Sequence, residues 1–147
     1  MSLIPTPVTT TTKKQKPMFK YQMTKLRNAS REYNGLWFPK ALHPITVTTE
    51  QLLKEIPKSC SLKRSDLLAA LTELSEFLLR HLRQGEVVDL DGIGRFKLEV
   101  KGQGVISPDD FDEQTDVSGY VCHFTPYSRN GRKPLFADIE LKREKEK

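Results

Sequence analysis

Little in this 147-residue sequence is typical of a secreted, membrane-spanning or metal-binding protein. Its two cysteines, Cys60 and Cys122, are too far apart for a CxxC pair and do not fit the spacing of a zinc site. No apolar run approaches membrane-spanning length, and the N-terminus lacks a charged-then-apolar signal pattern. We therefore expect a soluble, cytoplasmic protein with reduced cysteines and no membrane partner.

Signatures of catalysis are scarce as well. The histidines, His43, His81 and His123, are isolated and have no metal-ligand spacing with the cysteines. No nucleophile motif surrounds them, and the close pair Gly92 and Gly94 suits a hairpin rather than a phosphate-holding strand-to-helix loop. We expect no enzymatic activity, no cofactor, no metal and no small-molecule substrate.

Positive charge is in excess, with 24 Lys and Arg against 19 Asp and Glu, a net charge of +5 and a pI of about 9.2. This balance favours an anionic partner, nucleic acid or a membrane surface, without establishing one. The first 17 residues are rich in proline and threonine, contain Lys13, Lys14 and Lys16, and lack periodic apolar residues. They predict a flexible basic tail, which is either simply solvated or touches phosphates.

After this tail the sequence predicts two short strands. Apolar and polar residues alternate from Phe19 to Met23, which is the period of a strand. An apolar run at 36–42 follows a polar turn, and Pro39 restricts it to an edge strand or a strand end. We expect the two strands to form a small accessory sheet with Trp37 in its core.

A helical hairpin follows. Thr48 and Gln51 have the spacing of a capping box, at the start of a helix that Pro57 should end. A longer helix begins near Ser61 and ends before Gly85. Its apolar residues recur at spacings of three and four on one broad face: Leu67, Leu68, Leu71, Leu74, Phe77, Leu78 and Leu82. One short partner helix cannot cover this face, which therefore indicates a second subunit.

Residues 85–97 predict a strand, a tight glycine turn and a second strand. In the second strand apolar side chains alternate with charged ones, so one face packs under the helices and the other is open. The open face carries Arg95, Lys97, Glu99 and Lys101.

An acidic segment separates this hairpin from a returning strand. Residues 102–118 predict a loop, and no Lys or Arg occurs from Gly102 to Ser128. The loop carries five acids, Asp109, Asp110, Asp112, Glu113 and Asp116. A strand at 119–124 follows. A basic connection then leads to a last strand at 137–142, and it contains Arg129, Arg132 and Lys133.

Residues 48–125 resemble the bacterial histone-like HU/IHF family. Residues 61–66 (Ser-Leu-Lys-Arg-Ser-Asp) are similar to the start of the family's second helix. Residues 85–96 follow its helix-end, strand and turn signature, written here as Gly85-Glu86-x-Val88-x-Leu90-x-Gly92-Ile93-Gly94-x-Phe96. The extra strands at both ends, with Phe124-Thr125-Pro126 after the arm, resemble the variant HU-like proteins of Bacteroidetes.

The resemblance implies an α+β fold of intertwined dimers. Each copy would place a helical hairpin over a β-saddle with a β-arm and add strands at its two ends. Residues 18–147 would form this HU-like domain after the tail at 1–17. Its segments are the accessory strands at 18–47, the helical hairpin at 48–84, the saddle and arm at 85–125, and the basic connection and C-terminal strand at 126–147.

The resemblance also implies a function, that of an architectural, DNA-bending homodimer of the bacterial nucleoid that binds duplex DNA largely without sequence preference. Six side chains would contact phosphates, namely Arg95, Lys97 and Lys101 on the saddle and Arg129, Arg132 and Lys133 in the basic connection. The family's arm is basic with an Arg-Asn-Pro tip, whereas here Pro108 precedes two acids, which oppose phosphate attraction. The alternative is an HU-fold structural or protein-interaction module with reduced or lost DNA binding, whose acidic arm meets a basic partner.

Overall fold

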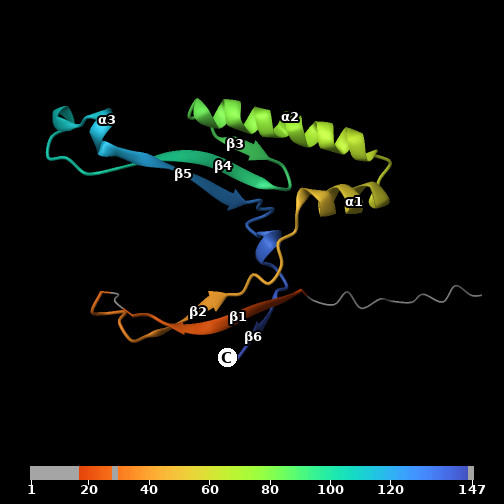
Figure 1. Ribbon diagram of the computed structural model, residues 1–147, viewed down its shortest axis with the longest axis horizontal. Helices are drawn as coiled ribbons and strands as arrows, with labels where there is room; N and C mark the ends of the chain where they lie inside the picture. Colours follow the sequence, from red (N-terminus) through yellow and green to blue (C-terminus); the bar gives the residue numbers. More distant parts are fainter. Residues whose placement is uncertain (1–16, 28–29, 146–147) are drawn as a thin grey trace, which may run out of the picture. The chain divides into compact units, whose positions relative to one another are not determined.

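The computed structural model describes residues 17–27 and 30–145, so the predicted basic tail at 1–17 lies outside them except for Pro17 (Figure 1). The chain divides into two compact units. Unit 1 consists of Met1–Pro44 and Asp138–Lys147, and unit 2 consists of Ile45–Ala137.

Unit 1 contains a three-stranded sheet in the order β2-β1-β6. The central strand β1 (Met18–Lys25) pairs antiparallel with β2 (Trp37–Ala41) and parallel with β6 (Glu140–Arg143). The two predicted accessory strands are thus confirmed, and Pro39 does lie in an edge strand, which tolerates its missing N–H. The last strand begins later than expected because Asp138 has a φ of 55°, which is incompatible with extended backbone.

Trp37 does not lie in a core, so that prediction was wrong. Its side chain is 52% exposed. Trp37 lies opposite Lys25 at the end of the edge strand, and the Lys25 Nζ is 6.0 Å from the centroid of its ring. A residue at the end of an edge strand has strand neighbours on one side only, so a large side chain there stays accessible.

Unit 2 begins with the helical hairpin, whose first helix is α1 (Thr49–Ser59). The helix continues through Pro57 instead of ending there, because a proline in the last turn removes one backbone hydrogen bond and leaves the preceding turns intact. The capping box is also absent. Thr48 is the N-cap residue, but its side chain makes no capping hydrogen bond, and the Gln51 amide donates to the Glu55 carboxylate instead.

The second helix, α2 (Arg64–Arg83), begins later than expected and ends before Gly85 as expected. Gly85 has a φ of +79° and donates its N–H to the Leu82 carbonyl at 3.0 Å, which is a glycine-terminated helix end. The helix contacts α1 and the first two strands of unit 2. On its apolar face Leu67 is buried, but Phe77 is 40% exposed, so the described residues cover this face only in part.

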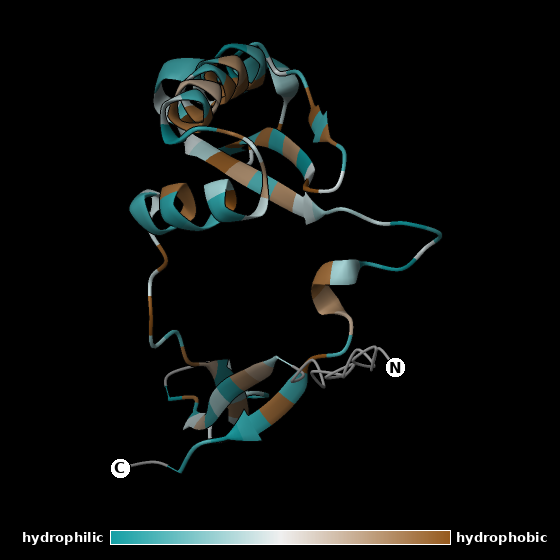
Figure 2. Cartoon of the chain, turned by 90° about the vertical axis from the view of Figure 1, so that its right-hand side faces the viewer, coloured by the Kyte–Doolittle hydropathy of each residue, from teal (hydrophilic) through white to brown (hydrophobic). Residues whose placement is uncertain are grey.

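A second three-stranded sheet, in the order β3-β4-β5, completes unit 2. The strands β3 (Val88–Leu90), β4 (Gly94–Gly102) and β5 (Val117–Pro126) are antiparallel neighbours. Figure 2 shows hydrophobic and hydrophilic residues alternating along the strands, as the strand period requires. The predicted strand–turn–strand and the returning strand are confirmed.

The acidic segment between β4 and β5 is not simply a loop. It contains a 3₁₀ turn, η1 (Pro108–Asp110), and a short helix, α3 (Glu113–Asp116). Asp112 caps α3, because its side-chain oxygen accepts the Gln114 N–H at 2.9 Å. The acids that suggested a solvated loop therefore also supply the cap that orders part of it.

The apolar core of the described residues is small. Leu53 of α1, Leu67 of α2 and Val88 of β3 are its buried hydrophobic side chains, and all three belong to unit 2. A body of this size needs more buried apolar surface to offset the conformational entropy lost on folding. The fold of unit 2 therefore leaves apolar surface that a further partner could bury.

Candidate nucleic-acid interface

The outer face of the β3-β4-β5 sheet carries the charged row predicted from the sequence. Arg95, Lys97, Glu99 and Lys101 alternate along β4 with Phe96 and Leu98, which are partly buried on the opposite face. The strand period places the four charged side chains on one face. Three of the six predicted DNA contacts therefore lie in a single exposed row.

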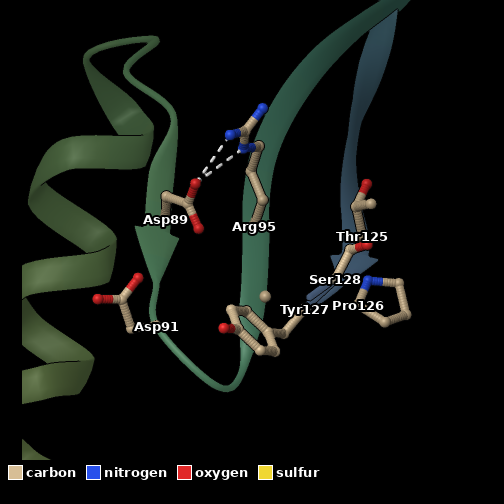
Figure 3. A pocket seen from close by; sticks show the side chains of 8 residues that line it. Asp89, Asp91, Arg95, Thr125, Pro126, Tyr127 and Ser128 are labelled. Atoms are coloured by element: carbon tan, nitrogen blue, oxygen red, sulfur yellow. Dashed lines mark hydrogen bonds and ion pairs between the residues drawn. The ribbon is translucent and has the colours of Figure 1, made fainter. Parts of the chain in front are cut away.

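Arg95, at one end of this row, is already paired. Its Nη2 lies 2.8 Å and its Nε 3.3 Å from the same oxygen, Oδ2 of Asp89, on the neighbouring strand β3. Figure 3 shows the guanidinium directed at this carboxylate across the two strands. The pair is possible because Asp89 and Arg95 are direct partners in the β3–β4 register. A phosphate must compete with Asp89 for this cation.

Lys97 is paired as well, in a cluster of three titratable groups. Glu99 accepts from the Lys97 ammonium at 2.7 Å, and its other oxygen lies 3.0 Å from Nε2 of His123 on β5. The hydrogen bond and positive charge of Lys97, followed by the charge of His123, hold the pKa of Glu99 below its ordinary value. Glu99 therefore stays ionised at neutral pH and offsets the charge of Lys97.

Lys101, at the far end of the row, is the least constrained of the three cations. It makes no ion pair with the described residues, and its cross-strand partner is Gly119, which has no side chain. Lys101 is exposed, so its ammonium can contact a phosphate without losing an existing partner. Two cations of the row, Arg95 and Lys97, are thus already ion-paired, and Lys101 has no ion-pair partner among the described residues.

The other three predicted contacts lie beyond β5, in the connection that leaves the sheet at its Arg95 end. Tyr127 anchors this connection by donating its N–H to the Ile93 carbonyl in the β3–β4 turn at 3.1 Å. Arg129 and Arg132 then close a tight turn through two backbone hydrogen bonds of 2.8 and 3.0 Å. The Lys133 ammonium lies 5.8 Å from the Phe136 ring centroid, just before the 3₁₀ turn η2 (Pro134–Phe136). Three of the six predicted contacts therefore lie in one row on β4, and the other three lie in the connection that follows β5.

A polar hollow of about 340 Å³ lies where the row meets this connection. Asp89 and Arg95 form one side, Thr125 and Ser128 form the other, and the Tyr127 ring lies below Arg95 near the β3–β4 turn (Figure 3). Asp91, Gly94 and Pro126 complete the lining. Its guanidinium and hydroxyl groups can hydrogen-bond an oxyanion, while its two carboxylates oppose one. Sequence reasoning noted Phe124-Thr125-Pro126 only as part of a family pattern and missed the hydroxyl groups beside Arg95.

Residues 18–133 match the family model described as an HU domain fused to a winged helix-turn-helix, Ig or glycine-rich motif, named HU-HIG. The match covers the accessory strands, the helical hairpin and the charged row. This chain belongs to the HU-HIG family. The resemblance to HU proteins that residues 48–125 suggested is thereby confirmed.

The fold of this HU-HIG protein is similar to that of one solved structure. It is a crystal structure from Bacteroides vulgatus, described as a candidate bacterial DNA-binding protein, with a TM-score of 0.59 and 14% sequence identity. The alignment covers 87% of this chain and 48% of the other, so the present chain spans about half of that protein. At this identity the comparison shows the shared fold. No curated protein matches the chain.

The described residues of this HU-HIG protein contain neither a metal-binding cluster nor a membrane-spanning helix. Residues 17–27 and 30–145 contain no group of three or more His, Cys, Asp or Glu side chains placed to hold a metal ion. In the same ranges no helix is long and apolar enough to cross a membrane. Cys60 and Cys122 are free and exposed. The charged face of β4 is the candidate functional site of the described residues.

Proposed function

We propose that this HU-HIG protein binds duplex DNA through the outer face of β4, as an architectural protein with little sequence preference. The observation that carries the proposal is the row of Arg95, Lys97 and Lys101 on one exposed face of an HU-domain sheet. Lysine and arginine side chains on a sheet face contact phosphates and carry little sequence information. Arg129, Arg132 and Lys133 would add phosphate contacts from the connection.

The ion pairs of the row predict weak binding with a steep salt dependence. DNA phosphates must displace Asp89 from Arg95 and Glu99 from Lys97, whereas Lys101 is open. Each lysine or arginine that neutralises a phosphate releases counterions, so affinity falls as salt rises. Of Arg95, Lys97 and Lys101, we therefore expect Lys101 to contribute the most to the affinity for DNA.

The proposed functional form is a homodimer that bends DNA at the bacterial nucleoid. The partly covered apolar face of α2 and the small core of unit 2 support a second copy. In an interlocked pair the two β4 rows would line one saddle and double the number of phosphate contacts. Bending would follow if the duplex wraps around that saddle, as in minor-groove architectural proteins.

A gel shift of the full chain on a duplex at low salt tests the proposal. Lys97→Gln together with Lys101→Gln should weaken retention at least tenfold, since two phosphate contacts are lost. The matched control, Lys58→Gln with Lys63→Gln, removes two lysines of the helical hairpin and should change retention much less. Glu99→Gln should strengthen retention because it frees Lys97. Unchanged retention in the Lys97/Lys101 variant, or none by the native protein, would overturn the proposal.

A second candidate function is a protein-interaction module on the same fold. It is favoured by the exposed acids Asp109, Asp110 and Glu113 at the end of the β4–β5 ribbon, which have no ion-pair partner among the described residues. These acids repel phosphates and would attract a basic protein surface. Asp109→Asn with Asp110→Asn distinguishes the two candidates. Under the DNA proposal the native protein binds the duplex and the variant binds it more tightly, whereas under the second candidate duplex binding is reduced or absent in both and the variant loses affinity for a basic protein surface.

A further inference from the structure

The positive charge of the protein is concentrated in unit 1. Unit 1 contains twelve Lys and Arg against five Asp and Glu, whereas unit 2, which holds the charged row, contains twelve against fourteen. The HU-like hairpin and saddle are thus slightly acidic, and the accessory strands and chain ends supply the whole basic excess. An anionic ligand is attracted most strongly to the unit that sequence reasoning treated as accessory.

One face of the β2-β1-β6 sheet combines aromatic rings with cations. The register fixes its members, because Tyr21 lies opposite Ala41 and Arg143, and Phe19 opposite Leu141. Within these three strands, all of them described, the face contains no acidic residue. Its members are Phe19, Tyr21, Met23 and Lys25 of β1, Trp37, Pro39 and Ala41 of β2, and Leu141 and Arg143 of β6. We call this set the aromatic face.

The rings of the aromatic face are accessible. Phe19 is 40% and Trp37 52% exposed, and Tyr21 between them is partly exposed. Phe19 and Trp37 mark two ends of a platform roughly 20 Å long, at about 3.3 Å per residue along β1. A hollow of about 500 Å³ lies on this face, lined by Phe19, Tyr21, Met23, Pro39, Ala41 and Leu141.

One cation lies at the Trp37 end of the platform and another lies beside Tyr21. Lys25 is beside Trp37, with its Nζ 6.0 Å from the ring centroid, and Arg143 is the register partner of Tyr21. The opposite face differs, since it carries Glu140 and the 3.0 Å ion pair between Lys20 and Glu144. Exposed rings with flanking cations and no acids are the features that a base-stacking surface needs.

We propose that the aromatic face binds single-stranded nucleic acid, with unpaired bases stacked on Phe19, Tyr21 and Trp37 and phosphates held by Lys25 and Arg143. A single strand fits better than a duplex, because paired bases are stacked on each other and do not present their faces to a flat sheet. Stacking is tolerant of sequence, and both DNA and RNA single strands supply it. This site is separate from the β4 row proposed for duplex DNA.

Trp37 is the chain's one tryptophan, so its fluorescence reports directly on this face. The full chain is titrated at low salt with unlabelled oligothymidylate, oligouridylate and a duplex of equal length. We expect saturable quenching by a single strand and weaker quenching by the duplex. Comparison of the oligothymidylate and oligouridylate titrations shows whether the face prefers DNA or RNA. Lys97→Gln with Lys101→Gln should leave the quenching intact, which separates this site from the duplex site.

Phe19→Leu is the decisive variant, with Phe38→Leu on the opposite face of the same sheet as its matched control. Loss of one stacking ring should weaken single-strand binding roughly 5- to 100-fold, whereas the control should stay near native affinity. Lys25→Gln should weaken binding and reduce its salt dependence. Absent quenching, equal quenching by dextran sulfate, or equal effects of the two phenylalanine variants would overturn the proposal. So would a Phe19→Leu variant that lost only self-association, which would identify the face as a contact between copies.

Discussion

At the residue scale, Gly92 and Gly94 make the tight turn between β3 and β4 possible. Gly92 has a φ of +78°, a conformation that favours glycine. Gly94 has a φ of +150°, and a Cβ there would lie 2.4 Å from the Thr125 carbonyl oxygen and 2.7 Å from the Phe124 ring. The turn conformation and the close approach of β5 therefore each require a glycine, and glycine positions can be read directly from a sequence.

Gly94→Ala should destabilise the fold by about 2 kcal/mol or more, because the added methyl group meets backbone that cannot move aside. Gly104→Ala is the matched control, since a Cβ at Gly104 meets nothing within 4 Å. It should be near neutral. Urea denaturation followed by circular dichroism measures both variants. Equal midpoints for the two would contradict the close approach of β4 and β5 at Gly94.

The ion-pair partners of the charged side chains could not be predicted from the sequence. The alternation along β4 placed Arg95 and Lys97 on an open face, but the carboxylates that neutralise them could not be assigned. Asp89 reaches Arg95 through the β3–β4 register, and the Glu99–His123 contact depends on the β4–β5 register. Register depends on the loop between the strands, and the acidic loop before β5 has no simple turn signature. The charges of the candidate site were predictable, whereas their partners were not.

At the element scale, helices and strands with strong periodicity were predicted well, and errors collected at their ends. The apolar spacing of α2 and the alternation in β1 and β4 survive any change of tertiary context. Pro57 within α1 and the early start of β5 depend on local hydrogen bonds that a pattern does not show. The tight turn at Asn130-Gly131, where both residues have positive φ, carries an Asn-Gly signal that was overlooked.

The apolar face of α2 leads to a prediction about assembly. Phe77 and Leu74 line a hollow of about 430 Å³ beside Leu90, where a second copy could insert a side chain. Phe77→Ser should weaken the proposed dimer by roughly several hundredfold, because a two-fold interface loses roughly 2 kcal/mol at each of two sites, or about 4 kcal/mol in total. Light scattering across a dilution series measures the change.

Leu79→Ser is the control for this prediction, since Leu79 is also a large exposed residue of α2 but does not line this hollow. It should leave the dimer intact. A native protein that is a stable, folded monomer at all concentrations would refute the assembly proposal. Equal weakening by the two variants would mean that the interface lies elsewhere on the helix.

At the scale of the whole molecule, the division into two units could not be read from the sequence. The sheet of unit 1 joins β1 near one end of the chain to β6 near the other, and this parallel pairing spans more than a hundred residues. Periodicity predicts that each segment is a strand but says nothing about distant partners. The sequence showed a net positive charge, but only the division of the chain shows that unit 1 carries it.

This charge distribution makes a last prediction about the rate of DNA binding. Arg27, Arg31 and Lys40 are exposed in unit 1, and none has an ion-pair partner among the described residues. Replacing all three with glutamine should slow association with duplex DNA several-fold at low salt and leave dissociation nearly unchanged, because charges that do not contact the duplex act on the encounter. Surface plasmon resonance separates the two rates, and the effect should fade as salt shortens the Debye length.

The opposite change provides the control for this rate effect. Asp109→Asn, Asp110→Asn and Glu113→Gln together remove three negative charges from unit 2. This variant should speed association by a similar factor, since the two triple variants shift the net charge by the same amount in opposite directions. If the unit 1 variant instead dissociated faster with an unchanged association rate, those cations would contact the duplex directly. The duplex site would then extend beyond the β4 row, and the separation of duplex and single-strand sites would fail.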